Sequence, residues 1–230
     1  MFENLSDRLS GVFGKLTKQG ALSDVMAGTD VFIGVSAPDV LTVDDISAMN
    51  ADPIVFAMAN PDPEIRPELV GDMVRVMGTG RSDYPNQINN VLAFPGIFRG
   101  ALDARATDIT EGMKLACAKA LAALAKEEVP DTVIEAYGGK ELKFGPGYLI
   151  PKPFDHRVLL YVAPAIAQAA IDDGVARVKD FDIDGYTREL EKYLGGSHSV
   201  MAAVEEKAKR VQATVAFAEG EEPRAQRAAA

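Results

Sequence analysis

The chain contains 230 residues, which is enough for one domain of ordinary size with its own hydrophobic core. Hydrophobic residues make up 47% of the chain and charged residues 25%, which is typical of a protein that folds and not of a disordered or collagen-like one. The formal net charge of -10 would repel a nucleic acid backbone or an anionic membrane, so the composition argues against both as partners.

The cysteine and histidine contents restrict the chemistry further. Cys117 is the only cysteine, and with two histidines the chain has too few soft ligands for a zinc cluster and no partner for an internal disulfide bond. The most apolar stretch, residues 158–171, has about 14 residues and falls short of the roughly 20 that cross a bilayer. No signal-peptide pattern follows Met1. We therefore predict a cytoplasmic protein.

The first predicted element is an amphipathic helix over residues 2–16, where apolar side chains recur every three or four positions. Apolar runs rich in β-branched residues follow at 30–35, 53–58 and 73–77, with stretches of helical character between them. This alternation predicts an α/β fold whose parallel sheet has about three strands covered by helices. Small and polar residues follow each run, at the edge where open α/β sheets bind ligands.

The rest of the chain is predicted to be mainly helical. Asp108 or Thr110 can cap one of the candidate helices, and the glycine- and proline-rich stretch 138–153 is predicted to be an ordered loop. A further strand is predicted at 213–217. The candidate helices cover residues 86–103, 111–126, 132–136, 157–172, 185–194 and 200–209.

Several residues with possible chemical roles favour simpler structural ones. Residues 78–83 begin like a dinucleotide-binding fingerprint, but Asp83 stands where its third glycine is needed, so a turn is favoured. Cys117 is predicted to be buried among apolar neighbours. We expect His156 to lie at the surface or cap a helix, and His198 to lie in a linker.

The densest polar stretch covers residues 79–90 and is followed at once by the apolar residues 91–96. Burying such a cluster costs free energy unless its amides form hydrogen bonds with the backbone, with water or with a ligand. Asparagine carboxamides carry donors and an acceptor, and therefore suit a ligand with both a carboxylate and a carboxamide. An elaborate helix cap and a ligand site are equally supported at this point.

Motifs along the chain resemble the nicotinamide-cofactor-binding domain of bacterial malic enzymes, which oxidise and decarboxylate malate to pyruvate. The resemblance covers roughly residues 21–195 and implies a partial Rossmann-like domain that uses NAD or NADP, in a family that also uses Mg²⁺ or Mn²⁺. The motifs are residues 30–38, 59–65, 79–87, 89–91, 98–103, 113–116 and 150–155.

The resemblance implies roles for three asparagines. Asn60 is expected near the nicotinamide ribose, and Asn89 and Asn90 near the nicotinamide and the malate carboxylate. Ser36 and Ala37 follow the first predicted strand and are predicted cofactor contacts as well. The family's proton-transferring Tyr and Lys, its metal ligands and its first glycine-rich loop would lie upstream of the matched region, so no catalytic residue or metal ligand is predicted here.

The two ends resemble other proteins. The first residues are similar to the first helix of the signal recognition particle GTPase, and residues 215–222 to the start of the phosphotransacetylase-like domain of long bacterial malic enzymes. We therefore predict an N-terminal helix over 1–20, a partial cofactor domain over 21–195, and a linker with a truncated domain start over 196–230.

The predicted function is that of a malic enzyme family fragment that binds cofactor weakly and lacks the catalytic groups. A partial sheet leaves an uncovered apolar edge, and an amphipathic helix can dock on a second copy. The alternative is therefore a non-catalytic interaction or oligomerisation module, and a homo-oligomer is expected in either case.

Overall fold

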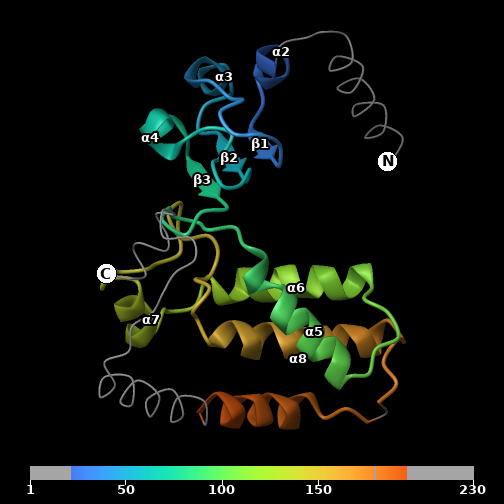
Figure 1. Ribbon diagram of the computed structural model, residues 1–230. Coiled ribbons are helices and arrows are strands. Elements are labelled where there is room, and N and C mark those ends of the chain that lie inside the picture. The colour runs from blue at the N-terminus through green and yellow to red at the C-terminus, as the bar shows by residue number, and fades with distance from the viewer. Residues whose placement is uncertain (1–21, 179, 196–230) are drawn as a thin grey trace, which may run out of the picture. The chain divides into compact units, whose positions relative to one another are not determined.

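The computed structural model describes residues 22–178 and 180–195 (Figure 1). The chain divides into two compact units, Met1–Ile183 and Asp184–Ala230, and the described part of the second unit is helical. The helix predicted at 185–194 is observed at 183–195. The elements predicted at 2–16, 200–209 and 213–217, the predicted domains 1–20 and 196–230, and His198 lie outside the described residues.

A parallel sheet forms the first part of the larger unit. Its strands are β1 (Val31–Gly34), β2 (Ile54–Ala57) and β3 (Val76–Thr79), and they lie in the order β1-β2-β3. The helices α3 (Val43–Ser47) and α4 (Pro67–Val70) connect them. The prediction of an α/β fold with about three parallel strands is confirmed.

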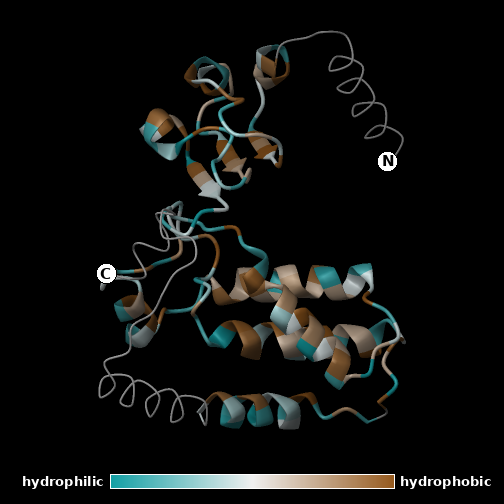
Figure 2. Cartoon of the chain, in the orientation of Figure 1, coloured by the Kyte–Doolittle hydropathy of each residue, from teal (hydrophilic) through white to brown (hydrophobic). Residues whose placement is uncertain are grey.

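One face of this sheet is covered by helices and the other is exposed at β1. Both crossovers advance in the same direction, and connections of the same hand then place α3 and α4 on one face, together with α2 (Leu22–Met26). Figure 2 shows hydrophobic residues on β1 and β2. On the opposite face Ile33 and Val35 are 63% and 79% exposed. The core residues are Met26, Leu41, Ile46, Met49, Val55, Ala57, Ile65 and Val70.

The third strand begins later than the sequence predicts. Residues Gly71–Met73 form a short 3-10 helix, η1, which Gly71 enters with a φ of 44°. Met73, the predicted start of the strand, is 39% exposed. The apolar run at 73–77 therefore combines the end of a turn with the start of β3, and the predicted boundary was wrong.

The second part of the larger unit is helical, as predicted. The helices are α5 (Phe94–Asp103), α6 (Glu111–Leu124), α7 (Asp131–Ala136) and α8 (Arg157–Asp172), and α8 packs against both α5 and α6 (Figure 1). The predicted boundaries of α8 are confirmed. Of the two residues proposed as caps of α6, Thr110 is the N-cap, and its hydroxyl oxygen accepts a hydrogen bond from Met113 N at 3.1 Å.

The helix predicted at 86–103 begins only at Phe94. Asn86 has a φ of 52°, which a helix does not allow, and Asn90–Leu92 form a separate 3-10 helix, η2. Pro95 then occupies the first turn of α5, a position where its missing N–H costs no hydrogen bond. Residues 86–93 are thus an ordered connection, in which the Asn86 side chain and the Asn89 Oδ1 bond to the backbone.

Other single-residue predictions for this part have clear outcomes. Cys117 is buried within α6, and burial raises the pKa of its thiol. His156 is exposed at the N-cap position of α8, and its side chain makes no capping hydrogen bond. Within the part of the chain that the structure describes, no helix has both the length and the apolar character needed to cross a membrane.

Two glycines bring α5 close to α8. A Cβ atom at Gly100 would lie 2.3 Å from the carbonyl oxygen of Ala163 and 2.7 Å from Ile166 Cβ. A Cβ at Gly96 would lie 2.6 Å from Val162 Cγ1. Real Cβ atoms do not approach backbone so closely, so this helix pair requires glycine at position 100.

We expect Gly100→Ala to lower the free energy of unfolding. Alanine has the higher helix propensity by about 1 kcal/mol, but separating α5 from α8 costs about 1–3 kcal/mol. Urea unfolding followed by circular dichroism measures the difference. Gly147→Ala is the control, because no atom lies within 4 Å of the added Cβ. If Gly100→Ala is at least as stable as Gly147→Ala, the close packing of the helices is refuted.

Candidate functional site

The candidate site lies at the carboxyl edge of the sheet. Parallel strands end at the same edge, so the segments that follow β1, β2 and β3 meet there. These segments contain the five residues predicted to bind cofactor or substrate, namely Ser36, Ala37, Asn60, Asn89 and Asn90.

The carboxylate of Glu64 joins the first two of these segments. Its Oε1 accepts hydrogen bonds from Ser36 N at 2.8 Å and from Ser36 Oγ at 3.1 Å, and its Oε2 accepts one from Ala59 N at 3.0 Å. Glu64 is fully buried. A buried carboxylate is stable only when hydrogen bonds replace its lost hydration, and here both flanking loops supply the donors.

These contacts keep Glu64 ionised. Burial alone would raise the pKa of its carboxyl group, but the hydrogen bonds from Ser36 N, Ala59 N and the Ser36 hydroxyl outweigh this effect and lower the pKa below the ordinary 4.5. The space for the carboxylate comes from Gly34, where a Cβ would lie 2.5 Å from Glu64 Oε1. Glycine is required here for volume, since its φ is not positive.

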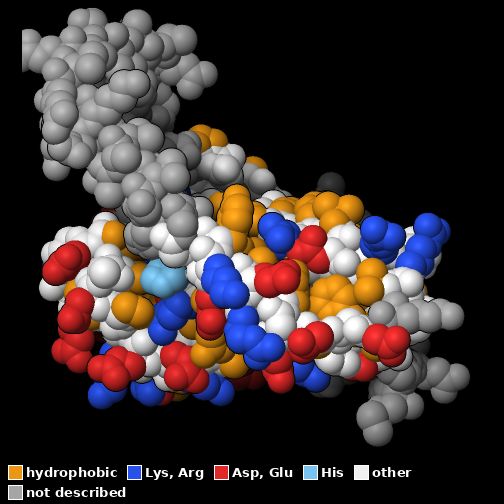
Figure 3. Space-filling view, turned by 90° about the horizontal axis from the view of Figure 1, so that it is seen from below, with side chains coloured by type: hydrophobic (Ala, Val, Ile, Leu, Met, Phe, Trp, Pro, Cys, Tyr) orange, Lys and Arg blue, Asp and Glu red, His pale blue; other side chains and the backbone are white. Residues whose placement is uncertain are grey.

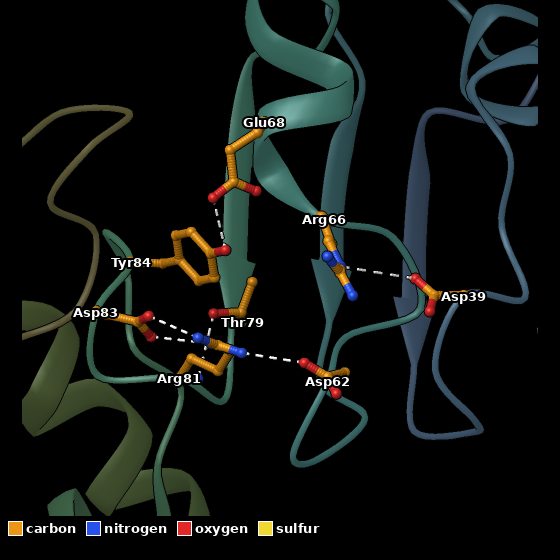
Figure 4. Close-up of polar contacts among 8 residues, drawn as sticks. All are labelled: Asp39, Asp62, Arg66, Glu68, Thr79, Arg81, Asp83 and Tyr84. Carbon is orange, nitrogen blue, oxygen red and sulfur yellow. Dashed lines mark hydrogen bonds and ion pairs between the residues drawn. The ribbon is translucent and has the colours of Figure 1, made fainter. Parts of the chain in front are cut away.

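Arg81 joins the segment after β2 to the segment after β3 (Figure 4). Its Nε and Nη2 donate to the two oxygens of Asp83 at 2.9 and 2.7 Å, and its Nη1 donates to Asp62 Oδ1 at 3.1 Å. The hydrogen bond to Asp83 raises the pKa of Arg81 above its ordinary value. Asp83 lies in a turn, as the sequence predicts, whereas residues 78 and 79 of the predicted turn belong to β3. The ion pair of Asp83 with Arg81 was not predicted.

Tyr84 extends these contacts to α4. The Arg81 guanidinium lies 5.2 Å from the centre of the Tyr84 ring, and the Tyr84 hydroxyl donates to Glu68 Oε1 at 2.7 Å (Figure 4). That hydrogen bond raises the pKa of Tyr84 and lowers the pKa of Glu68. Two residues of the segment after β3 therefore hold the region that follows β2.

The segment after β3 returns alongside its own strand. Thr79 and Gln87 form a parallel bridge, and Ile88 N donates to Thr79 O at 2.7 Å. Because the bridge is parallel, the chain passes Gln87 in the same direction as the strands, and Asn89 follows at their carboxyl edge. A Cβ at Gly80 would lie 3.7 Å from Met58 O and 4.0 Å from Ile88 O, so the chain just before Asn60 and just before Asn89 lies beside the same glycine.

The side chain of Asn86 holds this segment in place through three hydrogen bonds to the backbone. Its Nδ2 donates to Met77 O at 2.9 Å and to Pro146 O at 2.7 Å, and its Oδ1 accepts from Leu149 N at 2.8 Å. The side chain is buried, and its positive φ is one that asparagine tolerates. Asn86 therefore satisfies the backbone of β3 and of the loop 146–149.

The predicted site residues differ in which of their hydrogen-bonding groups remain available to a ligand. Ser36 donates its hydroxyl hydrogen to Glu64, which leaves the oxygen as an acceptor, and exposed Ala37 offers backbone groups only. The Asn89 Oδ1 caps η2 by accepting from Val91 N at 3.0 Å, so the helix-cap interpretation holds for part of this residue.

The other carboxamide groups at this edge face solvent. Asn60, which precedes a cis peptide bond to Pro61, and Asn90 are exposed. Among the described residues, neither their carboxamides nor the Asn89 Nδ2 have a hydrogen-bond partner. These groups are available to a ligand, and the roles of the five predicted residues stay predictions.

Three structural residues of the site were not identified from the sequence. Glu64, Arg81 and Asn86 lie inside the recognised motifs, but each also bonds a distant partner, 28, 19 and 60 residues away in the chain. A signal for Glu64 was present, because a carboxylate near the end of a buried strand needs donors there. Nothing in the spacing identified the partners of Arg81 or Asn86.

A metal site is a separate question. Within residues 22–178 and 180–195, no three His, Cys, Asp or Glu side chains form a group that could hold a metal ion. The described carboxylates at the edge are instead engaged with Arg81, Ser36 and Tyr84. The donor set of the described residues therefore does not fit Mg²⁺ or Mn²⁺.

We expect Glu64→Gln to lower the free energy of unfolding by about 2 kcal/mol at neutral pH, because one amide donor would face a backbone N–H that is itself a donor. The folded-state pKa of Glu64 lies below 4.5, so its contribution is present above that pH and is lost as the pH falls through the folded-state pKa. Urea unfolding between about pH 7 and pH 3 should show this loss in the unsubstituted chain and less of it in Glu64→Gln.

The control for this comparison is Glu111→Gln, because the Glu111 side chain is 91% exposed. It should keep both the stability and its pH dependence. Equal stability of Glu64→Gln and Glu111→Gln at neutral pH would show that the buried carboxylate does not hold the edge together.

The chain is similar to known malic enzymes in sequence and in structure. Residues 71–134 match the family model described as "Malic enzyme, NAD binding domain". The chain is 48% identical over 216 residues to the NADP-dependent malic enzyme of Rhizobium meliloti, covering 93% of this chain and 28% of that protein. It is 46% identical over 231 residues to the NAD-dependent malic enzyme of the same organism, covering 99% of this chain and 30% of that protein.

A solved structure agrees with these relatives. The malic enzyme from Pyrococcus horikoshii superposes with a TM-score of 0.68 at 38% identity, over 82% of this chain and 40% of that one. The chain thus spans less than a third of the two curated relatives. In sequence and fold, this chain corresponds to part of the NAD(P)-binding region of the bacterial malic enzymes.

Proposed function

We propose that this chain supplies the nicotinamide side of the cofactor site in an NAD(P)-dependent oxidative decarboxylation of malate to pyruvate. The observation that carries the proposal is a set of groups without a partner, namely the carboxamides of Asn60 and Asn90 and the Nδ2 of Asn89, which follow neighbouring strands at one edge of a parallel sheet. Relatives named as NAD-dependent and as NADP-dependent malic enzymes both support it, so either cofactor is compatible. A cytoplasmic location remains part of the proposal.

The proposed roles follow from the donors and acceptors that remain free. Asn60 would hydrogen-bond the nicotinamide ribose, with the Ser36 hydroxyl oxygen and the backbone of Ala37 nearby on the neighbouring loop. Asn89 Nδ2 and the Asn90 carboxamide would bind the nicotinamide amide and a malate carboxylate. When bound, the cofactor accepts the hydride. The residues described here bind and orient, and we assign no proton transfer to them.

We expect NAD⁺ or NADP⁺ to shift the side-chain amide resonances of Asn60, Asn89 and Asn90 in a ¹⁵N-labelled chain. Asn86 and Asn50 are internal controls that should not shift. Asn86 is buried with its carboxamide bonded, and Asn50 donates to Gly28 O and Asp30 Oδ1 at the amino end of β1.

Substitution tests the same contacts. Asn89→Ala and Asn90→Ala should each weaken cofactor or malate binding about five-fold, since each removes about one hydrogen bond. The proposal fails if neither cofactor moves the three resonances, or if the shifts appear equally at Asn50.

A second candidate function is self-association, as the sequence predicts for a homo-oligomer. Apolar side chains form an exposed stripe from η2 along α5, and the rings of Phe94 and Phe98 stack with centroids 5.9 Å apart. Figure 3 shows hydrophobic side chains in patches between charged ones on one face of the molecule. Exposed apolar surface of this kind favours association. The stripe consists of Val91, Phe94, Phe98 and Leu102, with exposures of 47%, 51%, 48% and 72%.

We expect light scattering at micromolar concentration to give a mass above the 24.5 kDa of one chain. Leu102→Glu should shift the chain toward the monomer, because burying the new charge in an interface is costly. Leu115→Glu is the matched control, since Leu115 is 55% exposed on α6 and lies outside the stripe. A monomeric unsubstituted chain, or equal effects of the two substitutions, would rule out this stripe as the interface.

A further inference from the structure

We infer that Arg81 is a positioning residue for the cofactor site, because it bridges Asp62 to Asp83 and so sets the spacing between the loop of Asn60 and the loop of Asn89. The inference rests on the proposed function, since it assigns Arg81 a task only if these loops hold one ligand. Arg81 itself need not touch that ligand.

The bridge connects the two loops close to the asparagines. Asp62 lies two positions after Asn60, and Arg81 and Asp83 lie at the start of the segment that ends in Asn89. The Asp83 contact uses both Nε and Nη2, which fixes the plane of the guanidinium, and this plane directs Nη1 to Asp62 at 3.1 Å (Figure 4). The side chain thus has a defined orientation and is not a mobile surface cation.

Further contacts hold Arg81 from the other side. Its backbone N donates to Thr79 Oγ1 at 3.2 Å, and Thr79 is fully buried at the end of β3. The Tyr84 ring lies 5.2 Å from the guanidinium and is itself tied to Glu68 in α4. Arg81 is therefore connected to the sheet through Thr79 and to α4 through Tyr84, in addition to the two aspartates that it bridges.

The charge arrangement argues against Arg81 as a direct binder of the malate carboxylate. Two aspartates already neutralise the guanidinium, and a third anion would be repelled by both. The Arg81 and Asp62 side chains are 31% and 43% exposed, so the pair contributes little to global stability. The pair therefore acts on the spacing of the two loops. A purely structural role would instead require a contribution to global stability.

The experiment compares Arg81→Gln, Asp62→Asn and their double variant with the unsubstituted chain. Cofactor affinity is measured by titrating NAD⁺ and NADP⁺ against the amide resonances of Asn60, Asn89 and Asn90, and stability by urea unfolding. Hydrogen exchange of the backbone amides in 59–65 and 80–90 reports the loops without any cofactor. The matched control is Arg66→Gln, because Arg66 pairs with Asp39 at 3.9 Å on the same edge with both side chains exposed.

We expect Arg81→Gln and Asp62→Asn each to weaken cofactor binding about five-fold and to raise exchange in both loops, with the unfolding midpoint unchanged. The double variant should bind no more weakly than Arg81→Gln, since the two substitutions break one bridge. Arg81→Lys should recover part of the affinity, because lysine keeps the positive charge but lacks the paired N–H donors of the guanidinium. Arg66→Gln should match the unsubstituted chain.

Each other outcome overturns the inference. Cofactor affinity that is unchanged in Arg81→Gln removes the positioning role and leaves the proposed function standing. Additive effects in the double variant, or a loss of affinity that only follows a loss of stability, show that the bridge is not the cause. If the unsubstituted chain binds neither cofactor, the proposed function fails and the positioning role fails with it, although hydrogen exchange still reports whether Arg81 holds the loops.

Discussion

The buried carboxylate of Glu64 is the interaction on which the arrangement of the sheet edge depends. A charge removed from water must find donors, and the donors available are Ser36 and Ala59, in the loops that follow β1 and β2. The carboxylate therefore joins these two loops, together with the backbone hydrogen bonds from Asp39 N to Pro63 O and from Leu41 N to Glu64 O. The same requirement excludes a side chain at position 34, where the carboxylate occupies the space of a Cβ. One charge thus determines both loop geometry and local sequence.

The asparagines at this edge divide into a structural and an exposed set. Asn86 is turned inward and uses its carboxamide to satisfy three backbone groups. Asn89 is intermediate, because one of its atoms caps η2 and the other remains free. Asn60 and Asn90 are exposed. Identical side chains within a short stretch therefore differ in role according to burial, which composition and spacing do not reveal.

The sequence was sufficient to predict the architecture, but it did not identify the residues that hold the site in place. The apolar runs at 30–35 and 53–58 identify β1 and β2, and the boundaries of α8 match a long, mostly apolar stretch that contains Pro164 and Gln168. The start of β3 was missed because the apolar Met73 belongs to η1, and the start of α5 because Asn86 adopts a positive φ. The roles of Glu64, Arg81 and Asn86 depend on partners far away in the chain, and residue periodicity carries no information about such pairs.

Asn86 also links the folding of the two parts of the larger unit. Its side chain connects Met77 in β3 to Pro146 and Leu149, which are 60 and 63 residues further along the chain than Asn86. The loop at 146–149 precedes α8, so these hydrogen bonds form only once that distant loop lies beside β3. Closing so long a loop costs entropy that only later contacts repay, which favours a single cooperative transition over stepwise assembly. Loss of this carboxamide would leave Met77 O, Pro146 O and Leu149 N without their shared partner, at the place where β3 meets that loop.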